Sequence, residues 1–462
     1  MKLIYQVEDK PKFPQLIVFA LQQLLAIMTA TLVVPVVING DVEKLIEKTE
    51  ITWALEKPMS PAAALFGAGV GTLIYLLFTK KKSPVFLGSS FAFLGSMTSA
   101  FAGASTMALG YLGLILGAVI AGLVYVVIAI IVKIAGVRWI GKLMPPVVIG
   151  PTVAIIGLSL AGNAIGNSFG FGSPQAGYTM SGALWVNLVC ALVTLLTVIY
   201  FSVRGKKMLK LIPFILGILA GYVAALIFTL IGRASGNEAL LILDFSAFSS
   251  MKWVPEFSFI KAFEGLQAVD AKYIATIAVA YVPVAFVVFA EHIADHKNLS
   301  TIIGQDLLEE PGLHRTLLGD GVGSMVGAFF GGCPNTTYGE SIGCVAITGN
   351  ASVLTILATS VIAIAASFCG PFVTFLSTIP TCVMGGVCIT LYGFIAVSGL
   401  KMLQPVDLND NRNLFTASVI LIAGIGGMTM NIGSVTLTEV ACALILGVIV
   451  NLLFNRPAKN EK

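Results

Sequence analysis

The sequence predicts an all-α polytopic membrane protein with about fourteen transmembrane segments, arranged as two inverted repeats of seven spans. Of its 462 residues, 57% are hydrophobic and only 11% are charged, and the mean hydropathy is +0.95. Soluble domains carry about 25% charged residues. Apolar runs of about 20 residues recur, which is the length a helix needs to cross a bilayer. These runs are too long and unbroken for barrel strands, which alternate over about ten residues.

The first half of the chain, residues 1–231, is expected to form one repeat. Its first apolar run lacks a small-residue cleavage site, so we expect a retained helix and not a signal peptide. A mixed-charge loop, Asn39–Pro61, should follow it. The stretch Ser83–Phe93 has Pro and Gly first, β-formers next and small residues after, which predicts an extended piece leading into a half helix. With this broken segment, the expected spans are Leu16–Ile38, Ala62–Phe78, Ser83–Phe93, Ala108–Val132, Met144–Gly162, Ala183–Ser202 and Leu211–Ile231.

The second half, residues 273–462, is expected to form the other repeat. A polar loop, Gly232–Lys272, separates the halves, and its Asp270 should open the next helix. We expect a second broken segment at Gly331–Thr348, a loop at Asn431–Gly433, and a last helix that starts near Glu439. The expected spans are Tyr273–Asp295, Leu317–Phe330, Gly331–Thr348, Val353–Thr378, Cys382–Leu403, Leu414–Met430 and Thr436–Leu453.

The distribution of basic residues predicts that both termini are cytoplasmic. With an inside amino terminus and alternating spans, every basic cluster falls in an inside loop, as the positive-inside rule requires. The rule would fail if either broken segment did not cross, so it supports counting both as spans. The clusters are Lys80–Lys82, Lys133/Arg138/Lys142, Arg204–Lys210, Lys297/Arg315, Lys401/Arg412 and Arg456/Lys459.

Short segments of the first half are similar in sequence to segments of the second half. The segment Leu143–Gly150 resembles Ile379–Gly385, and Gly88–Phe91 resembles Asn335–Tyr338. Because each half has an odd number of spans, seven, the second half must enter the membrane from the opposite side. This arrangement is an inverted repeat. A matched pair of interrupted segments is the best sequence indicator of the binding site in such architectures.

Two carboxylates inside apolar regions are the main candidates for chemistry. A charge at a helix centre costs roughly 2.5–3.5 kcal/mol or more in lipid, so Glu291 and Glu340 are functional candidates. Asp295 lies one helical turn after Glu291 and on the same face. We expect Glu291 and Glu340 to face each other across a site, with the half-helix amides of Phe91 and Tyr338–Gly339 as donors. Their aromatic rings are placed to stack on a flat ligand.

No other residue type gives a signal as specific as that of these carboxylates. His292 should pack against another helix, His296 lies near the interface, and His314 lies in an inside loop. The seven cysteines form no CxxC pair, so we expect free thiols in helix packing, no disulfide framework and no metal site. No phosphate-binding GxxxxGK[ST] loop is present. The net charge of +4 requires no nucleic-acid partner, and no loop is large enough for a soluble catalytic domain, which disfavours a membrane enzyme or receptor.

Several motifs resemble the nucleobase–ascorbate transporter family, and within it the branch of bacterial uracil permeases. The resemblance covers nearly the whole chain. The motifs are Ala290–Ile293, Gln305–Leu308, Pro311–Arg315, Pro334–Glu340, the signature Glu340-Ser341-Ile342-Gly343-x4-Thr348-Gly349, and Gly88–Phe93.

The resemblance implies a proton-coupled symporter of the inner or plasma membrane that imports a nucleobase by alternating access. It implies a core domain, about residues 14–133 and 273–378, and a gate domain, about 142–231 and 380–455, with a homodimer formed through the gate domain. No cofactor is implied beyond the coupling proton. The implied substrate contacts are Phe91, Glu291, Gly339 and Glu340, with Ala30, Tyr338 and Tyr392 as pocket wall.

The chain departs from the uracil permease pattern at one position. That pattern has histidine one turn after the first glutamate, whereas this chain has Asp295, with His296 one position out of register. Proton coupling is therefore assigned to Glu291 with Asp295 and His296 as candidates. The acid at Glu340 favours uracil, because purine-selective branches more often carry glutamine there. The alternatives are a xanthine or uric acid:proton symporter and an anion transporter of the same fold.

Overall fold

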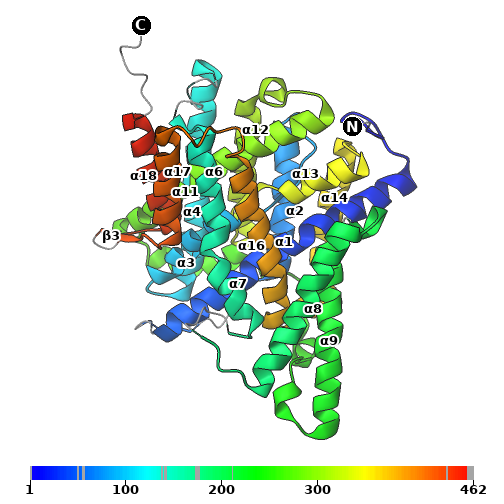
Figure 1. Cartoon of the computed structure of the whole chain (residues 1–462). Helices are drawn as coiled ribbons and strands as arrows, with labels where there is room; N and C mark the ends of the chain where they lie inside the picture. The colour runs from blue at the N-terminus through cyan, green and yellow to red at the C-terminus, as the bar shows by residue number, and fades with distance from the viewer. Residues whose placement is uncertain are drawn as a thin grey trace.

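The computed structural model of the chain is mostly helical (Figure 1). It describes residues 3–454 apart from 49–50, 52, 55–57, 137–138, 140–142, 172–176, 211 and 433–434. Within these residues, eight helical segments are long and apolar enough to cross a membrane, or nine if one bent pair is counted as a span. The eight are α1 (Phe13–Lys48), α2 (Pro61–Phe78), α4 (Met107–Ala135), α6–α7 (Pro146–Ser159 and Ala161–Ser168), α8 (Gly182–Arg204), α9 (Pro213–Ser235), α11 (Ala271–Ile303) and α16 (Thr381–Lys401).

Shorter helices fill the space between these segments. One of them, α18, starts at Glu439 as expected, and Asp270 caps α11 by accepting from the Tyr273 amide at 2.6 Å. The shorter helices are α3 (Leu94–Ala102), α10 (Ser258–Ala262), α13 (Gly339–Thr348), α14 (Val353–Ser367), α15 (Gly370–Ser377), α17 (Asn411–Ile425) and α18 (Glu439–Phe454), and α12 (Leu313–Gly331), which has 19 residues, packs among them.

The expected loop at Asn39–Pro61 is wrong for its first part, because α1 continues to Lys48. Tertiary contacts support the extra turns. The Asn39 side chain donates to the Met59 carbonyl at 3.0 Å and accepts from its amide at 2.7 Å, and Val42 is fully buried. α11 likewise runs past the expected end at Asp295, and its added turn buries Leu299.

Two expected elements of the second half are also corrected. The single span Val353–Thr378 is two helices, α14 and α15, bent by 79°, because Pro371 in the first turn of α15 starts a new helix. The expected helix Leu414–Met430 ends at Ile425. A hairpin of β3 (Met430–Ile432) and β4 (Val435–Leu437) follows it. The expected loop at Asn431–Gly433 is therefore wrong for Asn431 and Ile432, which lie in β3. Gly433 lies outside the described residues.

The helices pack in two groups. In the first group α12 lies against α2 and α4, α14 lies against α1 and α2, and α11 lies against α4. Small residues permit the closest approach: a Cβ added to Gly67 would lie 2.5 Å from the Gly327 carbonyl oxygen, as at other small-residue interfaces in membranes. In the second group α16 packs against α6, α7 and α8, with α9 beside α8 and α17 between α6 and α18 (Figure 1).

Both expected broken segments are present, and they meet as a pair of strands. β1 (Leu87–Ser89) pairs antiparallel with β2 (Asn335–Thr337), and Gly88 lies opposite Thr336. Each strand leads into a half helix: β1 into the turn η1 (Phe91–Phe93) and α3, and β2 into α13. This arrangement brings residues about 250 positions apart in sequence to one place.

Candidate functional site

The strand pair is buried, and neighbouring helices satisfy its outer polar groups. The Thr72 hydroxyl on α2 accepts from the Leu87 amide at 2.9 Å. The Ser341 hydroxyl on α13 accepts from the Phe86 amide at 3.0 Å, and it also hydrogen-bonds the Gln23 side-chain amide on α1. Because buried backbone groups are costly when unpaired, these side chains fix the position of the non-helical backbone.

The strand pair directs the amino termini of two half helices into one region. The residues that precede them, Ser90 and Tyr338, have extended backbone, and their side chains make no capping hydrogen bond. First-turn amides have no partner within their own helix, and the helix dipole places partial positive charge there. A Cβ added to Gly339 would meet nothing within 4 Å. Open space therefore adjoins the start of α13.

Three carboxyl groups lie beside these termini. Glu291 on α11 interacts electrostatically with Asp295 and with Glu340, which lies in the first turn of α13. Asp295 accepts a hydrogen bond from the Thr337 hydroxyl on β2 at 2.8 Å. The structure thus brings the three acids singled out from the sequence to one place, and one of them is tied directly to the strand pair.

A buried histidine network lies next to these acids, on α11 and α12. Nδ1 of His292 lies 2.7 Å from an Asp320 carboxylate oxygen, and its Nε2 lies 3.0 Å from the Thr316 hydroxyl. The ring of His296 stacks on that of His292 at 4.0 Å, and its Nε2 lies 2.7 Å from the Tyr75 hydroxyl. His292 therefore packs against another helix, as expected, and the proton-coupling role of His296 stays a prediction.

Sequence reasoning missed Asp320. It is fully buried on α12 as the partner of His292. An acid within the apolar, Gly-rich run Leu317–Phe330 was the available signal, and it is the same signal that singled out Glu291 and Glu340.

The expected wall residues occupy different positions. Tyr338 donates its hydroxyl to the Ser89 carbonyl at 2.8 Å, and its ring covers Gly88, so the ring packs on the strands and is not open to a ligand. Ala30 is buried within α1, only 1% exposed. The Phe91 ring meets the Tyr392 ring of α16 edge-on, with 5.9 Å between ring centres. Because η1 packs against α11 of the first group, Phe91 and Tyr392 form a contact between the two helix groups.

Two polar cavities lie between the helix groups. One, about 290 Å³, is lined by Phe91, by α3 and by residues of α6 and α18. The other, about 640 Å³, is lined by the second half of α1 and by α16. They share Asp41 and Asn163 as lining residues. The three acids of the site line neither cavity, so Phe91 is the expected substrate contact that borders this space.

The described residues hold no group of three His, Cys, Asp or Glu side chains that could bind a metal ion. All seven cysteines are free, and six of them are buried. The groups that the structure brings together at the site are carboxyl groups, backbone amides and aromatic rings. Apolar spans around paired half helices and an internal polar site define a multi-pass membrane transport protein.

Comparisons with known proteins agree with this class. The family model Xan_ur_permease, described as "Permease family", matches residues 14–433. The chain belongs to this permease family, and it is a transporter and not an enzyme. It is 40% identical to the uracil permease of Bacillus caldolyticus, covering 100% of this chain and 97% of that protein. It is 34% identical to the uracil permease of Escherichia coli (strain K12), covering 97% and 93%.

Solved structures share the fold at low sequence identity. The transmembrane domain of the cyanobacterial bicarbonate transporter BicA matches with a TM-score of 0.60 at 16% identity, covering 97% of this chain and 100% of that chain. The murine anion transporter Slc26a9 matches with a TM-score of 0.63 at 13% identity, covering 96% and 69%. At such identities the likeness shows the fold alone.

Proposed function

We propose that this chain is a proton-coupled symporter that imports uracil across the plasma membrane by alternating access. The observation that carries the proposal is the placement of Glu291 and Glu340 beside two half-helix termini that a buried strand pair brings together. Relatives named uracil permease, similar over nearly their whole length, support uracil as the substrate.

The chemistry of uracil suits these groups. A neutral planar pyrimidine presents N–H donors and C=O acceptors along its edge. The carboxyl groups of Glu291 and Glu340 accept from the N–H groups, and the backbone amides of Phe91 and Gly339 donate to the carbonyl oxygens. The Phe91 ring, with Tyr392 against it, forms the wall on the side of the second helix group, and Ala30 and Tyr338 lie behind the site.

Coupling to protons follows from the crowding of acids. Like charges held close together in a partly buried site disfavour full ionisation, so a proton on Glu291, shared with Asp295, relieves their repulsion. His296 is the third candidate in this relay. A loaded, protonated site then passes from one side of the membrane to the other when the core domain rocks against the gate domain.

The wider architecture belongs to the same proposal. It comprises fourteen spans in two inverted repeats, core and gate domains with the bounds given above, cytoplasmic termini and a homodimer formed through the gate domain. The transporter uses no cofactor other than protons and binds no nucleic acid, and its surroundings are membrane lipid.

The test is uptake of labelled uracil into proteoliposomes under an inward proton gradient. We expect accumulation that collapses when a protonophore is added, with unlabelled xanthine a weak competitor. Uptake of xanthine or uric acid in place of uracil would keep the proton-coupled mechanism but show that the substrate is a purine. Anion current without proton dependence would favour the anion transporter and refute the proposal.

A further inference from the structure

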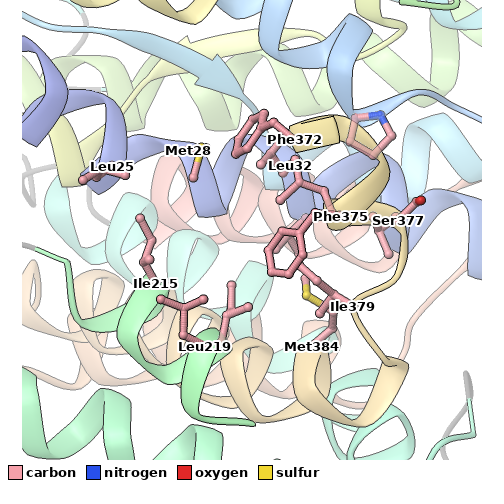
Figure 2. A pocket seen from close by; sticks show the side chains of 15 residues that line it. Leu25, Met28, Leu32, Ile215, Leu219, Phe372, Phe375, Ser377, Ile379 and Met384 are labelled. Carbon is pink, nitrogen blue, oxygen red and sulfur yellow. The ribbon is translucent and has the colours of Figure 1, made fainter. Parts of the chain in front are cut away.

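A third cavity, of about 300 Å³, differs in chemistry from the candidate site. Side chains of α1, α9 and α15 converge on it, including Met28, Leu32, Leu219 and Phe375 (Figure 2). Ser377 contributes the one polar side chain among its lining residues. An uncharged space of this kind offers a polar ligand a single side-chain hydroxyl, and burial of unpaired polar groups is costly.

The cavity reaches the outer surface of the protein. One of its lining residues, Leu219 on α9, is 45% exposed and lines neither of the two polar cavities. In a multi-pass membrane protein, exposed apolar side chains on the spanning helices contact lipid acyl chains and not water. Where α9 does not contact a second copy of the protein, the adjoining medium is therefore hydrocarbon.

The length of the cavity along α1 matches that of one acyl chain, which spans one lipid leaflet. Its α1 lining runs from Leu25 to Val36, a rise of about 16 Å at 1.5 Å per residue. The hydrocarbon core of a bilayer is about 30 Å thick, so one leaflet contributes about 15 Å. An acyl chain that enters from the side would lie along α1 over this length.

We propose that this cavity binds one acyl chain of a membrane phospholipid. The site is distinct from the candidate substrate site, because Phe91, Glu291 and Gly339 do not line it. It lies between α1 of the first helix group and α9 and α16 of the second. Its occupant therefore sets how closely the two groups approach each other.

The bound acyl chain also closes the polar cavity toward the bilayer. Val36, Ile379 and Met384 line both this cavity and the polar cavity of about 640 Å³. An acyl chain in the apolar space separates the polar cavity from the bilayer. Occupancy thereby links the lipid composition of the membrane to the movement of one helix group against the other.

The test uses the full-length protein in nanodiscs that contain phosphatidylcholine with a diazirine on one acyl chain. After illumination, labelled peptides are mapped by mass spectrometry. Leu219→Trp fills the cavity from α9. Val223→Trp is the matched control, since Val223 lies one turn along the same helix, is 53% exposed and does not line the cavity.

We expect the peptides that contain Leu25–Val36 and Ile215–Leu219 to be labelled several-fold above the exposed surface of α8. This excess should be lost in Leu219→Trp and retained in Val223→Trp. Leu219→Trp should also change the maximal uptake rate while the uracil concentration for half-maximal uptake stays the same. Labelling no higher than on α8, or equal labelling in both variants, would overturn the proposal. Labelling that appears only after dimers dissociate would assign the space to a second copy of the chain and would also overturn it.

Discussion

Gly88→Ala tests the packing that holds the two half helices in place. A Cβ at this position would lie 2.2 Å from Cε2 and 2.3 Å from Cζ of the Tyr338 ring, whereas ordinary contact begins near 3.4 Å. The ring must therefore retreat by about 1.2 Å. It cannot do so freely, because its hydroxyl donates to the Ser89 carbonyl at 2.8 Å.

The cost of Gly88→Ala has two parts. Overpacking of a tight core costs about 1–3 kcal/mol, and weakening a buried hydrogen bond costs about 1 kcal/mol more. We expect a loss of about 2–4 kcal/mol in the stability of the strand pair, seen as a lower apparent melting temperature in detergent by size-exclusion chromatography after heating. Uracil uptake should fall with it, because the amide of Phe91 moves.

Two glycines of the same region supply controls for Gly88→Ala. A Cβ at Gly95 meets only the Thr438 side chain, whose Cγ2 lies at 3.4 Å and Cβ at 3.9 Å, so Gly95→Ala should match wild type in stability and uptake. Gly339→Ala meets nothing within 4 Å, so it should fold normally but lose uptake, because its methyl enters the open space at α13. A Gly88→Ala protein with wild-type stability and uptake would refute the packing described for Tyr338.

Other predictions concern hydrogen bonds around the site and at the surface. Thr337→Val removes the donor to Asp295, a bond worth about 1.5–3 kcal/mol. We expect uptake to fall about tenfold or more, and Thr337→Ser, which keeps the hydroxyl, should retain it. Ser341→Ala leaves a buried amide without its acceptor, so the stability measured by thermal aggregation should fall by about 1–3 kcal/mol. A hydrogen bond from Lys82 holds the pKa of Glu310 below its usual 4.5, so its stabilising contribution is present above about pH 4.5 and is lost as the pH falls through the lower folded value. Glu310→Gln should therefore flatten the decline of thermal stability in that acid range, and an unchanged decline would contradict the pairing.

Local signals predicted the framework of the site. Pro and Gly next to β-formers marked both broken segments, and the structure pairs them as strands. Carboxylates in apolar runs singled out Glu291 and Glu340 because burial of charge is costly wherever it occurs. Such signals depend on a few neighbouring residues, so sequence alone reveals them.

Long-range packing produced what the sequence did not predict. The contact of His292 with Asp320 depends on how α11 meets α12. The burial of the Tyr338 ring depends on the opposite strand, since Gly88 leaves room for it. The extra turns of α1 depend on contacts from Asn39 to a segment 20 residues away. In each case a tertiary contact decides between local options of similar free energy.

Uracil-driven proton flux distinguishes proton symport from uncoupled uracil entry. Proteoliposomes would enclose a pH-sensitive dye, with no imposed pH gradient, and uracil would be added outside. We expect the lumen to acidify as uracil enters, Glu291→Gln to abolish the acidification, and Glu264→Gln, at an exposed position of the 3-10 helix η5 (Phe263–Gln267), to leave it intact. Uracil entry with no change in luminal pH, or unchanged acidification in Glu291→Gln, would contradict proton symport through this site.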